Sequence, residues 1–300
     1  MRRARYRAPA SAAVLAVVAW LVVGVSAAGQ TPAPELERLS RDIEAVLRPP
    51  LPSKDPLFIL AIGSDARPRG SVTRSLADSL HIIAVNPKTN VASILGIPRD
   101  SYVPIPGGGS QKINSSLFRG GPELVVQTVE RLTGIRMDGY LLVGFEGFRN
   151  MVSEVGGIEM VIPQAMSDSA SGAYFRPGKT RLDGPEALAF SRNRKGVRGG
   201  DFGRSLNQGL LMMAALREFR QDVRKEPANA FTWILAGARY LRTDLSFTEM
   251  VDLAFAALDV EKVKNRVVSG SGGFVGGASV VRLGSSAQAM FRDLARDGTL

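Results

Sequence analysis

From residue 57 onward, short apolar runs typical of strands alternate with longer stretches that have the apolar spacing of helices. Residues 57–62 are a continuous apolar run, which is typical of a buried strand. Residues 80–85 and 91–97 read as two further strands joined by a turn. The alternation predicts an α/β fold, an α-β-α sandwich with a central mixed sheet flanked by helices. We expect helices over 122–132, 145–155, 203–222, 229–241 and 246–258, and glycine-rich loops over 104–109 and 269–277.

The N-terminal segment contains an uncharged apolar stretch, Ala8 to Ala28, which follows a group of arginines. About 20 apolar residues span a bilayer, and basic residues stay on the cytoplasmic side, so the chain beyond this stretch is expected outside the membrane. A cleaved signal peptide is the alternative, because residues 25–27 resemble a cleavage site. The predicted organisation is a cytoplasmic basic tail and transmembrane helix at 1–29, a linker with a short helix at 30–56, and an extracytoplasmic domain at 57–300.

Composition narrows the chemistry that the domain can perform. The formal net charge is +10, and the domain remains basic without the N-terminal arginines, which suggests an anionic partner. Aromatic residues are not interleaved with the basic ones, so nucleic acid is not an expected partner. The chain has no cysteine, which excludes a thiol nucleophile, a thiolate metal site and a disulfide. A Ser–His–Asp site could use only His81, which lies within a predicted strand and is interpreted as a structural histidine.

Basic residues gather in the stretch 190–208, FSRNRKGVRGGDFGRSLNQ. Arg192 and Arg194 are two residues apart, so in an extended segment both would point to one face. Asp201 is a candidate N-cap for the next helix, and Arg204 falls in the first turn of that helix. Gln208 lies one turn further along the same face. Guanidinium groups around a helix N-terminus predict a phosphate site, and the alternative is a solvated basic loop.

Carboxylates lie beside the predicted strands, where such a site would form. Asp65 and Asp78 are the candidate metal ligands, because a chain without cysteine and with one histidine favours a hard cation. Magnesium needs only one or two carboxylates when substrate phosphates supply its other ligands. Arg99 and Asp100 follow the strand at 91–97, at a carboxyl end where α/β folds usually bind ligands. Each aspartate taken singly could instead be an ordinary turn or capping residue.

Seven motifs occur together and in order along the chain. They are GSDAR at 63–67, SILGIPRDSYV at 93–103, KIN at 112–114, GGPELVVQTVERLTGI at 120–135, FEGFRNMVSEVGGIE at 145–159, LDGPEALAFSRNRK at 182–195 and GGDFGR at 199–204. This series resembles the LytR–CpsA–Psr family of cell-wall glycopolymer ligases, strongly over about 57–220 and more weakly over 241–254. The N-terminal apolar stretch agrees with that family, whose catalytic domains lie outside the membrane.

The resemblance implies a phosphotransferase held in the bacterial cell membrane by a single helix. Such an enzyme moves a glycopolymer with its proximal phosphate from a polyprenyl-pyrophosphate carrier to a peptidoglycan hydroxyl, and it leaves polyprenyl monophosphate. The implied partners are the carrier-linked glycan, peptidoglycan and the cytoplasmic membrane. The resemblance implies Mg²⁺, or Mn²⁺ in its place, bound by Asp65 and Asp78, and it assigns catalysis to these two and Arg99. It assigns pyrophosphate binding to Arg99, Lys112, Arg192, Arg194, Arg204 and Gln208.

Two departures from the family pattern bear on this site. Leu76 stands where the family usually has an arginine, and Arg74 is the nearest replacement. Asn207 stands where the family tends to have a second arginine. Two other functions stay open: an envelope protein that binds polyprenyl phosphate without turnover, and a polyprenyl-pyrophosphate hydrolase. Retention of both Asp65 and Asp78 favours an enzyme, because binding the lipid phosphate needs arginines and not a metal.

Overall fold

The computed structural model describes residues 56–67 and 69–300. The predicted membrane segment at 1–29 and all but the last residue of the predicted linker at 30–56 lie outside the described residues. Within the described part of the chain, no helix is both long enough and apolar enough to cross a bilayer.

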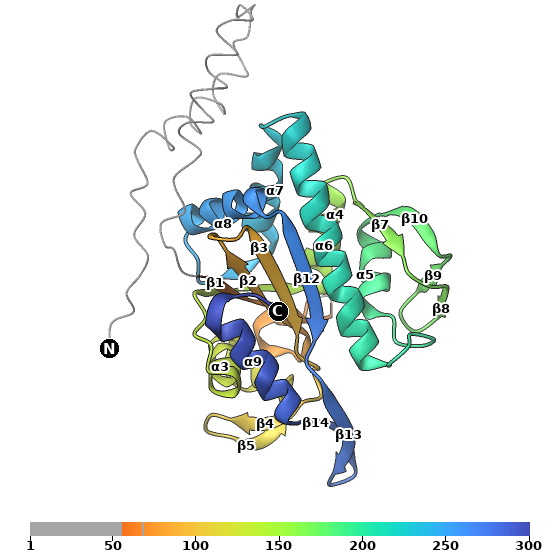
Figure 1. The fold of residues 1–300 in the computed structure, drawn as a ribbon. Coiled ribbons are helices and arrows are strands. Elements are labelled where there is room, and N and C mark those ends of the chain that lie inside the picture. The colour runs from red at the N-terminus through yellow and green to blue at the C-terminus, as the bar shows by residue number, and fades with distance from the viewer. Residues whose placement is uncertain (1–55, 68) are drawn as a thin grey trace, which may run out of the picture.

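A six-stranded mixed sheet forms the centre of the domain (Figure 1). Its strands are β1 (Leu57–Ser64), β2 (Ala77–Asn86), β3 (Val91–Gly96), β6 (Gly139–Gly144), β11 (Arg242–Thr243) and β12 (Lys262–Val267). They lie in the order β11-β6-β1-β2-β3-β12. β1 pairs antiparallel with β2 and parallel with β6, and β3 pairs antiparallel with β2 and parallel with β12. The predicted α/β fold with a central mixed sheet is therefore confirmed.

Helices pack on both faces of this sheet. The helices that the structure describes are α3 (Ser115–Thr133), α4 (Phe145–Glu154), α5 (Gly184–Arg192), α6 (Asp201–Lys225), α7 (Asn229–Tyr240), α8 (Phe247–Asp259), α9 (Ser285–Asp297) and the short 3-10 helix η1 (Val72–Arg74). Ile82 of β2 lies in one apolar core cluster with Leu117 of α3 and Phe291 of α9. The adjacent residue His81 contacts Ser205 of α6. Because side chains alternate along a strand, α3 and α9 pack on one face and α6 on the other.

Helix α3 contains a break that explains where its predicted boundary falls. Gly121 has a φ of 74°, in the left-handed region that glycine adopts without steric cost. Pro122 follows at the start of the second part, a position where its missing N–H costs nothing. The predicted helix at 122–132 is this second part, and its buried residues Val125 and Val129 face the main core.

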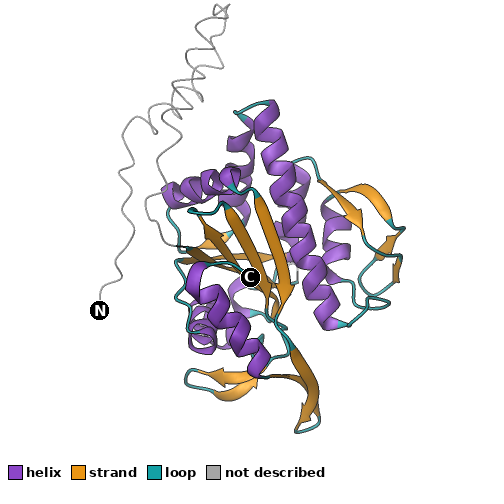
Figure 2. Ribbon diagram, in the orientation of Figure 1, coloured by secondary structure: helices purple, strands orange, loops and turns teal. Residues whose placement is uncertain are grey.

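Two-stranded ribbons accompany the central sheet (Figure 2). They pair β4 (Tyr102–Ile105) with β5 (Gly109–Lys112), β7 (Ile158–Ile162) with β10 (Gly178–Leu182), β8 (Met166–Asp168) with β9 (Ala173–Phe175), and β13 (Gly270–Val275) with β14 (Ala278–Leu283). The loops predicted at 104–109 and 269–277 are therefore wrong, since both segments contribute to hairpins. Gly276 and Gly277, with φ of 52° and 80°, supply the turn between β13 and β14, so these glycines shape a hairpin and not a loose loop.

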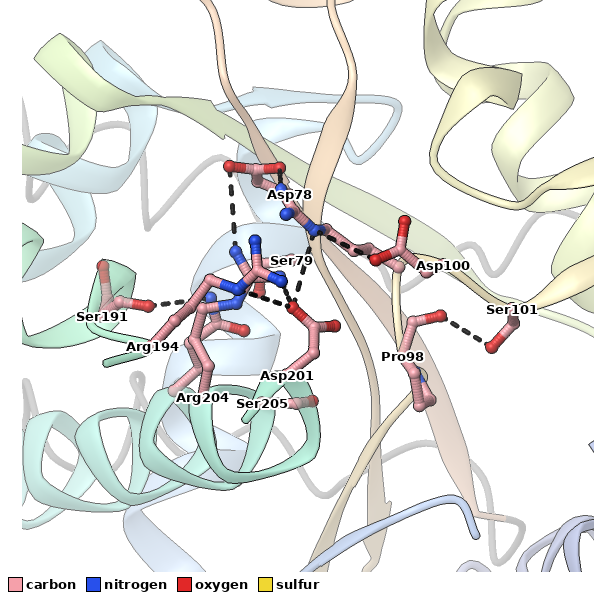
Figure 3. Close-up of polar contacts among 12 residues, drawn as sticks. Asp78, Ser79, Pro98, Asp100, Ser101, Ser191, Arg194, Asp201, Arg204 and Ser205 are labelled. Carbon is pink, nitrogen blue, oxygen red and sulfur yellow. Dashed lines mark hydrogen bonds and ion pairs between the residues drawn. The ribbon is translucent and has the colours of Figure 1, made fainter. Parts of the chain in front are cut away.

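The C-terminal hairpin is joined to the loop that follows β3. The Val281 N–H donates a hydrogen bond of 2.8 Å to the backbone oxygen of Asp100, and Ser101 forms a parallel bridge with Val281. The Ser101 hydroxyl in turn donates to the backbone oxygen of Pro98 at 2.7 Å (Figure 3). The segment that carries Arg99 and Asp100 is thus held from both sides.

Candidate active site

The candidate site lies at one end of the central sheet. Asp65 directly follows β1, and Arg99 follows the end of β3. Asp78 is the second residue of β2, which runs antiparallel to β1 and β3, so its start lies at the same end. Helix α6 also begins here, because Arg204 in its first turn reaches Asp78. Residues that are distant in the sequence therefore meet where the sheet topology predicts a ligand site.

Asp78 is contacted by two arginines from different elements (Figure 3). Arg99 donates a short hydrogen bond from Nη1 to Asp78 Oδ1. Arg204 places its Nη1 3.8 Å from Asp78 Oδ2. The Arg204 side chain is only 4% exposed. A cation this deeply buried needs partners, and the two carboxylates that it meets hold it in a fixed orientation.

Asp201 gathers three arginines around one carboxylate (Figure 3). Its Oδ1 lies 2.8 Å from Arg204 Nη2 and 3.6 Å from the Nε atoms of both Arg99 and Arg194. Among the described residues, neither buried Asp201 oxygen has a hydrogen bond of acceptable geometry. The contacts are therefore ion pairs with imperfect alignment, and a phosphate would offer the same guanidinium groups more acceptor oxygens.

Asp201 is not the N-cap of α6, although the sequence pattern predicted that role. Gly200, with a φ of 57°, is the N-cap of α6, and Asp201 is the first helical residue. Glycine at this point lets the chain turn sharply into α6, and the Asp201 side chain is then free to face the arginines. Local sequence pattern alone favours the cap, because aspartate is a common N-cap residue.

Lys112 joins the cluster through Asp100. Its Nζ lies 2.9 Å from Asp100 Oδ1, and Arg99 Nε lies 3.9 Å from Asp100 Oδ2. Lys112 is the last residue of β5, so the β4–β5 hairpin delivers it to the site. The ion pairs of the site are thus continuous from Lys112 through Arg99 to Arg204.

Burial and charge pull the arginine pKa values in opposite directions. Burial lowers the pKa of Arg204, against the opposing effect of Asp201, and Arg99 lowers it further by repulsion. Burial also acts to lower the pKa of Arg99, but Asp78, Asp201 and Asp100 together raise it above its ordinary value. Both guanidinium groups remain charged at neutral pH. The site is therefore a set of fixed cations whose mutual repulsion the aspartates offset.

Arg192 does not share a face with Arg194 as the sequence spacing suggested. Helix α5 extends through Arg192, so the two-residue period of a strand does not apply there. The Arg192 guanidinium lies over the ring of Phe145, 4.8 Å from its centroid, in a cation–π contact. Within residues 56–67 and 69–300 no ion pair joins Arg192 to the carboxylates that hold Arg194. The structure brings Arg194, Arg204 and Arg99 together at Asp201, whereas Arg192 lies over Phe145.

Gln208 and two asparagines form a buried polar layer under the arginines. Gln208 Nε2 donates to the backbone oxygen of Ser191 at 3.0 Å, which ties α6 to the end of α5. Asn193 is fully buried, and neither of its side-chain polar atoms has a hydrogen-bond partner among the described residues. The Nδ2 of buried Asn207 is likewise unpartnered in that part of the chain. Unsatisfied buried amides are costly, which makes both asparagines candidates for ligand contact.

Sequence reasoning missed Asp201 and Asn193 as site residues. Both lie inside motifs that carry the family resemblance, GGDFGR for Asp201 and FSRNRK for Asn193. Their place inside these motifs is the one sequence feature that could have identified them as site residues. Nothing in the local pattern distinguishes a buried amide between two arginines from an exposed one.

Asp65 sits beside Asp78 on the neighbouring strand. Its N–H donates to the Leu76 backbone oxygen at 3.0 Å, and its Oδ1 accepts from the Leu76 N–H at 2.8 Å. Ser64 pairs with Ala77, which sets the two aspartates at the same end of adjacent strands. No group of three or more potential ligand residues occurs in the described part of the chain. These two carboxylates, together with the oxygens of a bound phosphate, would fit the hard-oxygen ligand set that Mg²⁺ prefers.

Arg74 does not take the place of the arginine that the family usually has at the position of Leu76. Its Nη1 donates to the backbone oxygen of Arg119 at 3.2 Å, so the side chain reaches toward α3. Leu76 itself is exposed. This edge of the site is consequently less basic than the edge formed by Arg194 and Arg204.

His81 is buried beneath the site and connects β2 to α6. Its Nε2 lies 3.0 Å from the backbone oxygen of Ser205, and its Nδ1 lies 3.1 Å from the Ser79 hydroxyl. Because a carbonyl oxygen can only accept, the proton sits on Nε2 and the Ser79 hydroxyl donates to Nδ1. Burial, with a smaller effect of Arg204, lowers the pKa of His81 to about 4. His81 is a neutral structural residue, as its place within a strand suggested.

Known proteins share both sequence and fold with this chain. The LytR_cpsA_psr family model matches residues 27–296. A polyisoprenyl-teichoic acid–peptidoglycan teichoic acid transferase, TagU of Bacillus mycoides, is 36% identical over 179 residues, 59% of this chain and 57% of the relative. The crystal structure of TagV from B. subtilis superposes with a TM-score of 0.69 at 27% identity, covering 82% of this chain and 98% of that one.

A second solved structure, TagT bound to LI-WTA, has a TM-score of 0.67 at 25% identity and covers 81% of this chain and 91% of that one. The chain spans about half the length of the curated relatives that it matches. The family model covers far more, and it includes every residue of the arginine and aspartate cluster. The chain therefore belongs to the LytR_cpsA_psr family.

Proposed function

We propose that this chain is a phosphotransferase that moves a teichoic-acid-like glycopolymer, with its proximal phosphate, from a polyprenyl-pyrophosphate carrier to a peptidoglycan hydroxyl. The observation that carries the proposal is the convergence of Arg99, Arg194 and Arg204 on shared carboxylates at the start of α6. The names of the related transferase and of the TagT complex support the choice of substrate.

The arginines have a defined task in this reaction. When the acceptor hydroxyl oxygen attacks the phosphorus nearest the glycan, a new oxygen–phosphorus bond forms and the bond to the bridging oxygen breaks. Negative charge builds on the departing polyprenyl phosphate, and the hydroxyl proton passes to that phosphate or to solvent. Arg204 and Arg99 are fixed by Asp78 and Asp201 before substrate arrives, so they need no reorganisation to meet that charge. The N-terminus of α6 lies at the same end of the sheet, and the positive end of its helix dipole favours an anion there.

We further propose that Asp65 and Asp78 hold Mg²⁺, or Mn²⁺, beside the pyrophosphate. Asp78 is then shared between the metal and its two arginines, whereas Asp65 is oriented by the Leu76 N–H. The ion, when bound, neutralises phosphate charge and polarises the phosphorus that is attacked. Lys112 supports Asp100 and, through it, the loop of Arg99.

We propose that the enzyme is held in the cell membrane by residues 1–29, with residues 57–300 on the extracytoplasmic side. The support is the uncharged stretch Ala8–Ala28 behind N-terminal arginines. This placement puts the domain on the same side of the membrane as peptidoglycan.

The test is to incubate the full-length chain with polyprenyl-pyrophosphate-linked teichoic acid and peptidoglycan oligomers, in Mg²⁺ and in excess chelator. The expected result is a phosphodiester-linked product in Mg²⁺ and its loss in chelator. Release of free glycan phosphate without transfer would assign the chain as a hydrolase. Carrier binding without any turnover would make it a binding protein and overturn the proposal.

A further inference from the structure

A groove with a volume of about 510 Å³ lies between α6, β7 and β12, outside the candidate site. Apolar side chains form much of its wall, among them Met160 of β7, Met213 of α6 and Val263 of β12. Arg217, Arg220 and Arg224 complete the wall. These three lie at helical spacing, so one face of α6 presents an apolar half followed by a basic half. The volume is in the range of small-molecule sites.

None of the three arginines forms an ion pair with a carboxylate in the described part of the chain, although the charge of Arg217 adds, at longer range, to the effect of Lys179 in lowering the pKa of Glu159. The acidic residues of this region bind other cations: Glu159 pairs with Lys179 at 2.9 Å, Glu218 with Arg181 at 2.5 Å, and Asp222 with Lys225 at 3.8 Å. Arg217 Nη2 donates to the backbone oxygen of Glu159 at 3.4 Å.

Arg220 Nε is buried and has no hydrogen-bond partner in the part of the chain that the structure describes. A buried guanidinium nitrogen without an acceptor is costly, and an anion in the groove would satisfy it. Charge and burial at the basic half of the groove therefore both favour a bound anion.

The basic half lies at the opposite end of the sheet from the candidate site. Helix α6 starts at the site with Arg204 and ends at Lys225. Leu216 and Val263 pack with Val85 and Ala92, which belong to the ends of β2 and β3 remote from the site. β1 begins at this same end, since Leu57 pairs with Val85. The arginines are thus at the end of the domain to which the N-terminal segment is connected.

We propose that this groove binds an anionic membrane phospholipid, with its phosphate between Arg217, Arg220 and Arg224 and an acyl chain along the methionine-lined wall. An apolar wall beside clustered, unpaired cations matches a ligand with one anionic and one hydrocarbon part. Anionic lipid headgroups attract such arginines, and methionine adapts to irregular hydrocarbon chains. The proposal rests on the proposed membrane attachment but not on the transfer reaction.

The test uses the full-length chain in liposomes that contain phosphatidylglycerol with a photoreactive group on one acyl chain. Irradiation is expected to label peptides containing Met160, Met213 or Val263. A photoreactive phosphatidylcholine should label them far less. Neutralising the three arginines together, as R217Q, R220Q and R224Q, should lower groove labelling at least about tenfold, as expected when three membrane-surface cations are lost.

A matched variant, R131Q with R149Q and R292Q, removes three exposed helical arginines on other faces and should leave labelling unchanged. Labelling confined to the segment 8–28, or equal labelling by both lipids, would overturn the proposal. So would displacement by polyprenyl pyrophosphate at the concentration that saturates transfer, because the groove would then belong to the carrier. Transfer activity measured on the same liposomes separates failure of this proposal from failure of the proposed reaction.

Discussion

The two ends of α6 carry arginines in opposite settings. At its start, Arg204 is buried and paired with Asp78 and Asp201. At its other end, Arg224 is exposed and belongs to a group without carboxylate partners among the described residues. The paired arginines contribute to the fold as well as to anion binding, whereas the unpaired ones are available to a ligand without structural rearrangement. Four measurements test this difference between the two ends of α6.

The largest effect is expected from Arg204→Ala. Removal of the guanidinium takes the nearest cation from Asp201 and one of two arginines from Asp78, and breaking a buried pair costs about 3–5 kcal/mol of unfolding free energy. Loss of one contact to a charged phosphate, worth roughly 1.5–3 kcal/mol, should also lower transfer by about 10- to 100-fold. Urea unfolding and the transfer assay measure the two effects.

Arg198→Ala is the control for Arg204→Ala. Arg198 lies exposed in the same glycine-flanked segment, and its loss should leave stability and transfer nearly unchanged. Equal damage from the two variants would show that general basicity, and not the buried pairs, governs this segment.

The second-largest effect is the loss of native-state stability at low pH, which we expect from His81. Burial holds the pKa of His81 at about 4, below the 6.5 of the unfolded chain. The unfolded state therefore takes up the proton first, and the native state loses stability as the pH falls from about 6.5 to about 4. The complete loss is on the order of 3 kcal/mol, at about 1.4 kcal/mol per pKa unit.

His81→Gln should remove this part of the acid sensitivity. The measurement is the free energy of unfolding at pH 7.5 and at pH 5, compared between the variant and the natural chain. Both proteins have the same carboxylates, so the contribution of carboxylate titration to the pH dependence of unfolding cancels in this comparison. Identical pH slopes would mean that protonation of His81 does not contribute to the acid sensitivity of the fold.

Gly96→Ala tests the close approach of α6 to the sheet. A Cβ atom at this residue would lie 2.3 Å from Ser205 Oγ and 3.1 Å from His81 Nε2. Overpacking of this kind costs about 1–3 kcal/mol, and it should also weaken donor binding, because Arg204 precedes Ser205. Gly272→Ala, whose added Cβ meets nothing within 4 Å, should change unfolding by less than about 0.5 kcal/mol. If both substitutions were tolerated, α6 would not be packed tightly against the sheet at Gly96.

The smallest effect is expected from Arg224→Ala. An exposed arginine without an ion-pair partner in the described chain contributes within about 0.5 kcal/mol to unfolding. Transfer from a soluble donor analogue should also be unchanged. A loss of stability comparable to that of Arg204→Ala would remove the distinction between the two ends of the helix.

Sequence pattern predicts the regular parts of this molecule well and the side-chain convergence poorly. Continuous apolar runs place β1, β2 and β3, because a buried strand must be apolar on both faces. The hairpins at β4–β5 and β13–β14 escape the pattern, since their glycines resemble those of loops. Which edge of the sheet carries the site follows from topology alone.

Which side chains meet at the site depends on tertiary contacts, and local sequence patterns do not predict those contacts. Arg192 was expected to face the same way as Arg194, but the capping box of α5 starts a helix that runs through Arg192. Asp201 matches a helix cap locally, yet tertiary contacts with Arg99 and Arg194 decide its use. The motif resemblance selects Arg99, Arg194 and Arg204, and only the structure reveals that Asp201 lies between them.

The hydrogen bond between Val281 and Asp100 has a consequence for the order in which the molecule is assembled. The residues of the candidate-site loop are synthesised before those of β14, the strand that fixes this loop, because α6, α7 and α8 come between them in the chain. Pairing between distant segments is slow to form. A chain truncated before β14 would therefore retain every candidate residue from Asp65 to Gln208 but lose one of the backbone supports of the Arg99 loop, so β14 determines when the candidate site is complete.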